Sequence, residues 1–484
     1  MKGIIIGSGI GGLAAAIRLA KKGYEVSVFE ANTYPGGKLS EIWVNSYRFD
    51  TGPSLFTLPG MVDELFQLCN ENPAEHFAYK RLDIICKYFY EDGTIIRAWQ
   101  DIERFAEELS EKTGEKKINI YKFLDKSKLL YELTSDVFIF KSFHQLKTWI
   151  SRGFLKSILY GYKLNVFNTM DGVISKYFRD PRVRQLFDRY ATYNGSNPFA
   201  TPGTLNVIPN LEYNIGAFIP VKGMFDITRS MVNLAERQRV NFHFNSRVDE
   251  ILVKQKKVTG INSGGQFYPA DVIISDIDIV SAYKLLKEYQ LPQRYLRQER
   301  SSSALVFYWG VKDDHPDLEL HNILFSQNYR EEFEYLFKKK EIYADPTVYI
   351  NISSKEVNGD APSGSENWFT MINAPVNAGQ DWDRLISEVR VKIMEKIKRL
   401  TGIDIENKID AEDILHPGKI EQLTSSYRGS LYGNSSNSIF SAFNRHPNFS
   451  RSIKNLYFIG GSVHPGGGIP LCLASAKIAD SLIK

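Results

Sequence analysis

Short apolar runs at the start of the chain flank a glycine-rich turn and a stretch of helical periodicity. Gly3–Ile6 is apolar and rich in β-branched residues, as is typical of a parallel strand buried on both faces. Residues Leu13–Lys22 follow a helical pattern that ends at Gly23, a favourable residue just beyond a helix C-terminus. Glu25–Glu30 is a second strand-like run. The pattern predicts a β-α-β unit.

The same order of strand, glycine loop and helix returns near residue 484. Leu456–Ile459 is strand-like, Gly460–Gly468 is the loop, and Pro470–Ile483 is helical. Between the two ends, Val240–Phe244 and Asp271–Ser275 have the pattern of strands that return to the first unit. Further predictions are a hairpin around Glu91-Asp92-Gly93, strands at Ser303–Val311 and Trp368–Ala374, and an amphipathic helix over Leu385–Leu400.

These segments predict an α/β protein whose two lobes alternate along the chain. A length of 484 residues is too great for one ordinary core. We assign residues 1–65, 220–290 and 415–484 to a Rossmann-like nucleotide-binding domain assembled from discontinuous segments. We assign residues 66–136, 171–219 and 291–414 to an inserted mixed α+β lobe for the substrate, and residues 137–170 to a separate helical segment.

The turn after the first strand carries a dinucleotide-binding fingerprint. Gly7 permits a tight turn, Gly9 lets a pyrophosphate approach the backbone, and Gly12 allows the helix to pack closely on the strand. The pyrophosphate is expected at the helix N-terminus, where unpaired N–H groups favour negative charge. Glu30 can accept hydrogen bonds from ribose hydroxyls and disfavours a 2′-phosphate. Because strand, helix and acid follow in the required order, a fortuitous glycine turn is a weak alternative.

Two further glycine turns favour FAD over NAD as the ligand. Gly36, Gly37 and Lys38 offer a second phosphate-facing loop, in which the ammonium group can neutralise the pyrophosphate. Gly52 and Pro53 end the tetrapeptide Asp50-Thr51-Gly52-Pro53, for which an ordinary surface turn is an equal alternative. The compact order of these turns after the fingerprint indicates FAD, held without a covalent bond.

The C-terminal loop supplies a third element of a flavin site. Five glycines fall within the nine residues Gly460–Gly468, beginning with Gly460-Gly461. Such a loop costs conformational entropy unless its backbone closely approaches another group, so an exposed glycine-rich loop is a poor alternative. Gly468-Ile469-Pro470 starts the last helix, with Pro470 suited to the first helical position. The N-terminus of this helix would stabilise the negative charge of a reduced flavin.

The amino-acid composition limits which binding partners and which cellular compartment we expect. A net charge of +4 gives no reason to expect nucleic acid. Three cysteines without a CxxC spacing support neither a zinc site nor a disulfide framework, so we expect no metal and a reducing cytoplasm. No apolar run reaches the roughly 18 residues of a transmembrane helix. Early glycines and Arg18 argue against a signal peptide.

Residues 137–170 are aromatic and basic and contain no Asp or Glu. Basic side chains attract anionic headgroups and aromatic side chains insert at the bilayer interface, which predicts a peripheral, monotopic membrane-docking surface. A pair of core helices with a solvated basic face is the alternative. The residues concerned are Lys141, Lys147, Arg152, Lys156 and Lys163, interleaved with Phe138, Phe140, Phe143, Trp149, Phe154, Tyr160, Tyr162 and Phe167.

The glycine motifs belong to a longer set of segments, and this set matches one family. The set consists of Gly7–Gly12, Glu30, Pro35–Lys38, Tyr47–Pro53, Ile219–Met224 and Asn455–Pro470. At these residues, and essentially end to end, the chain resembles the carotenoid desaturases of the bacterial phytoene desaturase type, within the amine-oxidase-like flavoprotein superfamily. The resemblance implies FAD, an apolar tunnel, a carotenoid substrate, and oxygen or a quinone as electron acceptor. It also implies a cytoplasmic enzyme at the inner face of the cytoplasmic membrane.

Two departures from the phytoene desaturase pattern indicate a sub-branch. Lys222-Gly223 stands where the central motif is usually Pro-x-Gly-Gly, and Gly460-Gly461-Ser462-Val463 stands where many members have Gly-Ala-x-Thr. Together with Leu471-Cys472-Leu473, this variant is similar to the branch that introduces a 3,4 double bond into hydroxylated or monocyclic carotenoids, such as a 1'-hydroxy-γ-carotene-like molecule. Phytoene desaturation is the alternative within the family.

His464 and Glu212 are the candidate catalytic side chains near the flavin. The ordinary pKa of a histidine suits a base, but we favour a role for His464 in orienting the loop by hydrogen bonding. Glu212 is favoured as a structural or tunnel carboxylate. A strong base is not required, because charge on the substrate would spread over the polyene. We also assign Val248 to the candidate cofactor-binding residues.

Two other functions are compatible with the same fold. A flavin amine or protoporphyrinogen oxidase would bind a polar or planar substrate and would need no membrane surface. A non-enzymatic prenyl-lipid carrier, similar to the GDP-dissociation inhibitors, would have lost the flavin. The intact unit from Gly7 to Glu30 and the loop Gly466–Gly468 argue against such a carrier. We therefore expect an FAD-dependent oxidoreductase that acts on CH–CH bonds.

Overall fold

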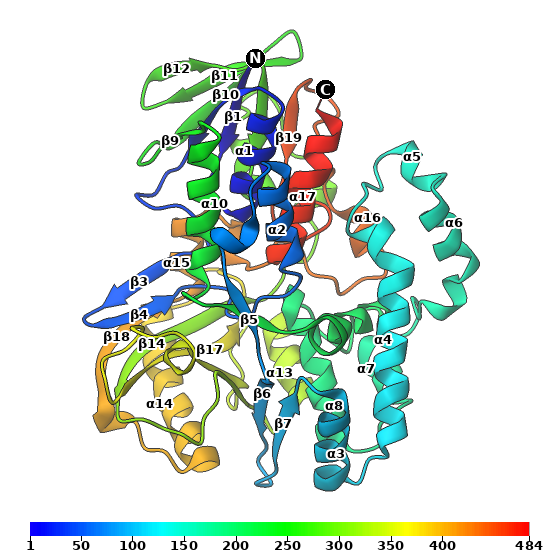
Figure 1. Cartoon of the computed structure of the whole chain (residues 1–484), viewed down its shortest axis with the longest axis vertical. Helices are drawn as coiled ribbons and strands as arrows, with labels where there is room; N and C mark the ends of the chain where they lie inside the picture. Colours follow the sequence, from blue (N-terminus) through cyan, green and yellow to red (C-terminus); the bar gives the residue numbers. More distant parts are fainter. Residues whose placement is uncertain (484) are drawn as a thin grey trace.

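A five-stranded parallel sheet forms the centre of the upper half of the molecule in Figure 1. The structure is a computed structural model that describes residues 1–483, with the backbone only for Leu146, Arg152, Leu155, Lys156 and Ile158. The sheet has the order β19-β13-β1-β2-β9, and each neighbouring pair is parallel. Its strands are β1 (Lys2–Ile6), β2 (Glu25–Phe29), β9 (Asn241–His243), β13 (Val272–Ser275) and β19 (Leu456–Phe458). All five predicted strands are confirmed, each within one residue of its predicted bounds.

Alternate side chains of this sheet belong to two different cores, because successive residues of a strand point to opposite faces. Ile5 packs with the helices on one face, where α1, α10 and α17 lie. Ile4 and Ile6 pack instead with the three-stranded antiparallel sheet β10-β11-β12. These elements are α1 (Ile10–Lys21), α10 (Phe225–Arg237), α17 (Ile469–Leu482), β10 (Val248–Lys254), β11 (Lys257–Ser263) and β12 (Gln266–Pro269).

Helix α1 begins three residues before its predicted start. Gly11 and Gly12 form its first turn, although glycine is a poor helix former. Close contact is the reason, because a Cβ on Gly12 would overlap the carbonyl oxygen of Gly7, and a Cβ on Gly11 would lie 2.5 Å from Oδ1 of Asp276. The helix therefore packs directly on the turn that follows β1, as the third glycine of the fingerprint predicts.

A mixed seven-stranded sheet forms the second lobe. Its order is β18-β14-β17-β16-β15-β6-β7, in which only the β15–β6 pair is parallel. One face packs on α14 (Trp382–Thr401), the helix predicted to be amphipathic. The predicted hairpin is confirmed as β6 and β7. The strands are β6 (Ile84–Phe89), β7 (Ile95–Trp99), β14 (Ser303–Lys312), β15 (His321–Leu324), β16 (Val348–Ile352), β17 (Ser365–Ala374) and β18 (Ile409–Leu415).

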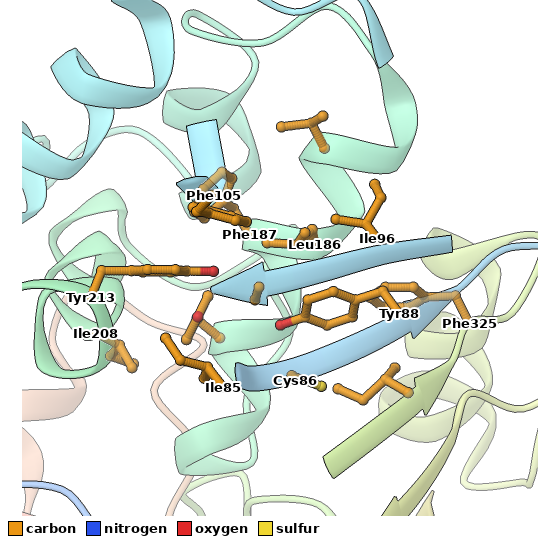
Figure 2. Packing of buried hydrophobic residues seen from close by; sticks show 14 of the residues in the cluster. Ile85, Cys86, Tyr88, Ile96, Phe105, Leu186, Phe187, Ile208, Tyr213 and Phe325 are labelled. Carbon is orange, nitrogen blue, oxygen red and sulfur yellow. The ribbon is translucent and has the colours of Figure 1, made fainter. Parts of the chain in front are cut away.

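The β6–β7 hairpin packs on helices of the same lobe. Figure 2 shows Ile85 and Tyr88 of β6 in one cluster with Phe105 of α3 and Phe187 of α8. The ring of Phe105 also stacks on Tyr213, with centroids 4.6 Å apart. Through this cluster, β6 and β7, which end the seven-stranded sheet, pack on the helices. The helices are α3 (Ile102–Thr113) and α8 (Pro181–Asp188).

Shorter elements connect the two sheets. The ribbons β3-β4 and β5-β8 are antiparallel. Their strands are β3 (Glu41–Val44), β4 (Tyr47–Asp50), β5 (Tyr79–Arg81) and β8 (Phe218–Pro220). The remaining α-helices are α2 (Gly60–Leu68), α4 (Lys117–Phe138), α5 (Leu146–Trp149), α6 (Arg152–Leu159), α7 (Met170–Ile174), α9 (Ile208–Asn210), α11 (Ile279–Lys284), α12 (Gln293–Leu296), α13 (Tyr329–Glu334), α15 (Pro417–Thr424) and α16 (Ser441–Asn444).

Residues 137–170 lie at one side of the molecule, where α5 and α6 follow α4 (Figure 1). Their aromatic side chains differ in exposure, and the predicted membrane-docking surface stays a prediction. Phe143 is buried, and Phe138 and Phe154 line a cavity. Tyr162 and Phe167 are instead 76% and 91% exposed. The side chains of Arg152 and Lys156, which belong to the predicted surface, lie outside the described part. Among the described residues, no helix has both the length and the apolar character needed to cross a membrane.

Replacing Gly12 with alanine tests the contact between α1 and the turn after β1. The added Cβ would overlap the Gly7 carbonyl oxygen, so we expect the free energy of unfolding to fall by about 1–3 kcal/mol. Gly60→Ala is the matched control, because Gly60 also starts a helix and nothing lies within 4 Å of its added Cβ. Denaturant unfolding measures both variants. A Gly12→Ala protein as stable as the wild type would contradict the packing.

Candidate active site

One cavity is lined by residues from both ends of the chain. Its volume is about 1280 Å³. This exceeds the roughly 300–1,000 Å³ of most small-molecule sites, so it has room for a cofactor and a second ligand. Its wall contains the turn after β1, the loop Gly36–Lys38, the pair Gly52-Pro53 and the C-terminal glycine loop. Glycine backbone from the two chain ends therefore faces the same space, as the sequence predicts.

The first two glycine loops are built against each other. The N–H of Gly36 donates to the carbonyl oxygen of Ser8 at 2.9 Å, and Gly9 and Gly36 form an isolated parallel bridge. A Cβ on Gly37 would lie 3.5 Å from Cα of Gly9. Gly7, with φ of 93°, and Gly37, with φ of 58°, have left-handed backbone that favours glycine. The second loop thus extends the fingerprint rather than forming a separate surface turn.

Glu30 is buried in the cavity wall directly after β2. Its Oε2 accepts hydrogen bonds from the backbone N–H and the hydroxyl of Ser8, at 2.9 and 2.8 Å. Its Oε1 accepts from the backbone N–H and the side-chain amide of Asn32, at 2.9 and 3.0 Å. Hydrogen bonding to a ribose stays a prediction. A carboxylate has about four acceptor sites, and these four donors already occupy them. A ribose hydroxyl must therefore displace one of these donors or bind to the same lone pair.

The Lys38 ammonium group contacts the C-terminal part of the chain. Its Nζ donates to the carbonyl oxygens of Ser430 and Leu431 at 3.2 and 2.8 Å. Burial lowers the pKa of Lys38 to about 8, and the nearby carboxylate of Asp278 opposes this effect. Lys38 is therefore positively charged below about pH 8. The predicted contact with a pyrophosphate competes with these two carbonyl groups.

The turn that begins at Asp50 is anchored by a buried carboxylate and is not an ordinary surface turn. The Asp50 carboxylate accepts hydrogen bonds from two backbone N–H groups at the start of α10, both at 2.8 Å, and from Arg48 at 2.7 Å. Gly223 precedes α10 with φ of 84°, and a Cβ there would lie 2.6 Å from the Arg48 guanidinium. Two segments far apart in sequence therefore form one unit, and this unit presents Gly52 and Pro53 to the cavity.

The C-terminal loop begins beside the first loop, since a Cβ on Gly11 would lie 3.5 Å from the backbone nitrogen of Gly460. Gly468 precedes α17, so Ile469 is the first helical residue and Pro470 the second, one position later than predicted for the proline. A Cβ on Gly468 would meet open space. The N-terminus of α17 therefore opens on the cavity. The wall here contains Gly460, Gly461, Gly468, Ile469 and Pro470, and it also includes Val248 from the start of β10.

His464 joins the C-terminal loop to residues 137–170. Its Nε2 donates to the carbonyl oxygen of Lys141 at 2.7 Å, and its ring lies edge-on to Phe143 with centroids 5.4 Å apart. Burial lowers the pKa of His464 to about 4, so the ring is neutral near pH 7 and is a weak base. Its Nδ1 has no hydrogen-bond partner in the part of the chain that is described. This arrangement favours the loop-orienting role over that of a base.

Glu212 lies behind the cavity wall. Its fully buried carboxylate accepts hydrogen bonds from Arg189 at 3.1 Å, from Tyr190 at 2.5 Å and from the hydroxyl of Tyr193. Arg189 and Tyr193 line the cavity, whereas Glu212 is not part of the described lining. The negative charge of Glu212 balances the positive charge of the buried Arg189 guanidinium. The placement therefore favours the structural alternative for Glu212 and does not support its assignment as a catalytic group.

One face of the seven-stranded sheet forms much of the remaining wall. Residues two apart on a strand point to the same face, and such pairs line the cavity. The pairs are Ala304 and Val306 on β14, His321 and Ile323 on β15, Phe369 and Met371 on β17, and Tyr349 on β16 with Thr347, which directly precedes that strand. Most of these side chains are apolar, so this part of the cavity suits a hydrocarbon chain.

Asp276 is a site residue that sequence reasoning missed. A Cβ on Gly9 or on Gly11 would lie 2.5 Å from one of its carboxyl oxygens, and a Cβ on Gly460 would lie 2.6 Å away. Burial raises the pKa of Asp276 to about 7, with Glu30 adding to the rise and the N–H of Gly12 opposing it. Its place in the sequence could have revealed it. Asp276 directly follows a predicted parallel strand, and ligands bind at the carboxyl ends of such strands.

The residues present fit an FAD molecule. The helices α1 and α17 both begin after a glycine, without a side-chain cap, at the wall of one cavity. The N–H of Gly12 already donates to Asp276, and the remaining N–H groups of the two first turns can bind anionic groups. A pyrophosphate suits the N-terminus of α1, and the pyrimidine edge of a flavin suits that of α17.

Comparisons with known proteins agree with this site. Residues 10–479 match the family described as flavin containing amine oxidoreductase. A 1-hydroxycarotenoid 3,4-desaturase of Flavobacterium sp. (strain P99-3) is 51% identical over 483 residues, which cover 100% of this chain and 99% of that protein. A 4,4'-diapolycopene oxygenase of Methylomonas sp is 30% identical, covering 99% of this chain and 97% of that protein.

A solved structure shows the same fold. Cyclohexylamine oxidase from Brevibacterium oxydans IH-35A has a TM-score of 0.64, with 99% of this chain and 98% of that chain covered. The two sequences are 15% identical, so the likeness concerns the fold alone. The parallel sheet and the mixed seven-stranded sheet therefore belong to an amine-oxidase-like FAD-binding α/β fold.

The raised pKa of Asp276 predicts that the affinity for FAD falls as the pH rises. The folded protein keeps a proton on this carboxyl group up to about pH 7, whereas an unfolded chain releases it at about pH 4. The free energy of unfolding of the FAD-free protein therefore falls across this window. The negative charge of a bound pyrophosphate would disfavour the ionised form of Asp276 further. Binding above pH 7 thus takes up a proton, and the affinity should fall by up to about tenfold per pH unit.

Asp276→Asn removes the titrating group and keeps its size. We expect the affinity of this variant for FAD to fall less steeply than that of the wild type between about pH 6.5 and 8.5, because of the two groups only Lys38 still titrates there, and to exceed that of the wild type at the higher pH. Titration of FAD-free protein with FAD, followed by flavin fluorescence, measures both dissociation constants. The account fails if wild type and variant show the same pH dependence.

Proposed function

Since the chain belongs to the flavin containing amine oxidoreductase family and is an FAD-dependent oxidoreductase, we propose that it introduces a 3,4 double bond into a hydroxylated carotenoid. One observation carries this proposal: the 51% identity, over the full length, to a protein named 1-hydroxycarotenoid 3,4-desaturase. The apolar sheet face that continues from the glycine loops supports it, because a polyene needs a long apolar site.

Desaturation removes two hydrogens from neighbouring carbons, one as a hydride and one as a proton. Bound FAD supplies the hydride acceptor. The wall residues Val306, Phe369 and Met371 would hold the polyene. Positive charge on the substrate spreads over the conjugated double bonds, so a base as weak as water can accept the proton. This is compatible with the low pKa of His464 and with the position of Glu212 behind the wall. Oxygen or a quinone is proposed to take up the electrons afterwards.

A panel of carotenoids tests the proposed reaction. The FAD-loaded enzyme is incubated with phytoene, with a 1-hydroxylated carotenoid and with a monocyclic carotenoid. We expect the hydroxylated substrate to lose two hydrogens by mass and to absorb at longer wavelength, because one more double bond joins the conjugated system. Phytoene should be converted at less than about one tenth of that rate, since a site built around a hydroxyl group discriminates strongly.

Each other outcome of this assay contradicts the proposal in a different way. Conversion of phytoene without conversion of hydroxylated carotenoids would assign the chain to the phytoene branch. A product that gains oxygen would assign it to the oxygenases, of which one shares 30% of its sequence. If no carotenoid is converted, and the same enzyme incubated with primary amines oxidises them, the chain would be assigned to the amine oxidases.

We further propose that residues 137–170 dock the enzyme on the inner face of the cytoplasmic membrane. The substrate resides in the bilayer, so the cavity must open toward it. Phe138 and Phe154 of this segment line the cavity, which places the segment at its boundary. Tyr162 and Phe167 are exposed on the same segment and have the character of interfacial anchors. The basic side chain of Lys147 is also exposed and would favour anionic headgroups.

Vesicle binding tests the docking surface. We expect Tyr162→Ser combined with Phe167→Ser to lower co-sedimentation with phosphatidylglycerol vesicles by about fivefold or more, because two interfacial side chains are lost. Trp43→Ser is the matched control, because Trp43 is 59% exposed on β3, which lies outside the segment. Activity on detergent-solubilised substrate should stay unchanged in both proteins. Equal loss of vesicle binding in both proteins would contradict docking through this segment.

A further inference from the structure

His321 places a hydrogen-bond donor on the wall of the cavity. The residue begins β15, and its side chain points to the same sheet face as Ile323, with both residues lining the cavity. His321 is 4% exposed, and its Nε2 has no hydrogen-bond partner among the residues that the structure describes. Leaving a buried donor unpaired is destabilising, so native proteins rarely do so without a ligand or a water in place.

The neighbours of Nδ1 determine where the imidazole proton lies. The amide nitrogen of Asn351 donates to the carbonyl oxygen of Leu320 at 3.1 Å, which fixes the orientation of that amide. The same nitrogen lies 3.1 Å from Nδ1 of His321, and the hydroxyl of Tyr349 lies 2.7 Å from it. Nδ1 therefore accepts, and the hydrogen is on Nε2. Burial, together with Arg189, lowers the pKa of His321 to about 3 and keeps the ring neutral.

The hydrogen-bond network of His321 extends to the cofactor-binding turn. The hydroxyl of Tyr349, which contacts His321, also lies 2.6 Å from Oγ of Ser54. Ser54 directly follows Pro53, a predicted cofactor-binding residue, and both line the cavity. Ile323 and Phe369 on the same sheet face are apolar. A polar donor is thus held on an otherwise largely apolar wall, and two hydrogen bonds through Tyr349 link its ring to the residue that follows Pro53.

We propose that Nε2–H of His321 donates a hydrogen bond to the hydroxyl oxygen of the substrate and thereby selects hydroxylated carotenoids over hydrocarbons. This inference rests on the proposed function. A hydrocarbon polyene has no acceptor and leaves the donor unpaired, whereas a hydroxyl group satisfies it. In a 1-hydroxy substrate, the carbon that bears the oxygen is two bonds from the carbon that reacts. The hydroxyl group must therefore lie close to the flavin, and Tyr349 and Ser54 connect His321 to the predicted cofactor-binding turn.

The test compares two substrates that differ only in the hydroxyl group. His321→Leu removes the donor, His321→Gln offers an amide N–H near the position of Nε2, and Ile323→Val is a packing control on the same strand face. For each FAD-loaded protein, kcat/KM is measured with a 1-hydroxylated carotenoid and with its hydrocarbon parent. We expect His321→Leu to lower the ratio of the two values by about tenfold, His321→Gln to restore part of it, and Ile323→Val to leave it unchanged.

Several results would overturn the inference. If His321→Leu lowers both kcat/KM values equally, the residue supports the fold without selecting the substrate. If it lowers the FAD content instead, the donor serves the cofactor. A wild-type enzyme that converts both carotenoids equally well leaves the proposed desaturation intact and overturns only the role of His321. A wild-type enzyme that converts neither carotenoid overturns both proposals.

Discussion

The parallel pairing of β13 with both β1 and β19 is the constraint on which the rest of the structure depends. It aligns three strands from distant parts of the chain, so that their carboxyl ends meet at one edge of the sheet. The glycine turn after β1, Asp276 after β13 and Gly460 after β19 become neighbours there. A Cβ on Gly11 would lie only 3.5 Å from the backbone nitrogen of Gly460. Two helix N-termini consequently open on one cavity, and a single dinucleotide can reach both.

The fold could be predicted from sequence where the signal is local. Buried parallel strands are short apolar runs, and all five were found from this pattern. The glycine turns were also predictable, because close approach of the backbone excludes any Cβ at Gly12 and Gly36. What the sequence did not reveal depends on contacts between distant residues. Asp276 lies between two loops that the sheet brings together, and Glu212 is paired with Arg189, 23 positions away.

The segment 137–170 shows a further limit of pattern reading. Its composition indicates both a membrane surface and a core, and composition cannot assign individual aromatic residues to one or the other. Phe143 packs against His464 of the C-terminal loop, whereas Phe167 is exposed on the same segment. One stretch of chain therefore contacts the predicted cofactor loop and also presents an outer apolar surface. This arrangement links the proposed membrane-docking segment to the wall of the cavity.

The central claim is that one FAD molecule bridges the two ends of the chain, and a crystal structure of the FAD-loaded protein tests it most directly. The account predicts electron density for a single FAD, with its pyrophosphate at the N-terminus of α1 and its isoalloxazine ring at the N-terminus of α17. Density confined to one of these helix ends, or a cavity that holds a different molecule in FAD-loaded crystals, would contradict it.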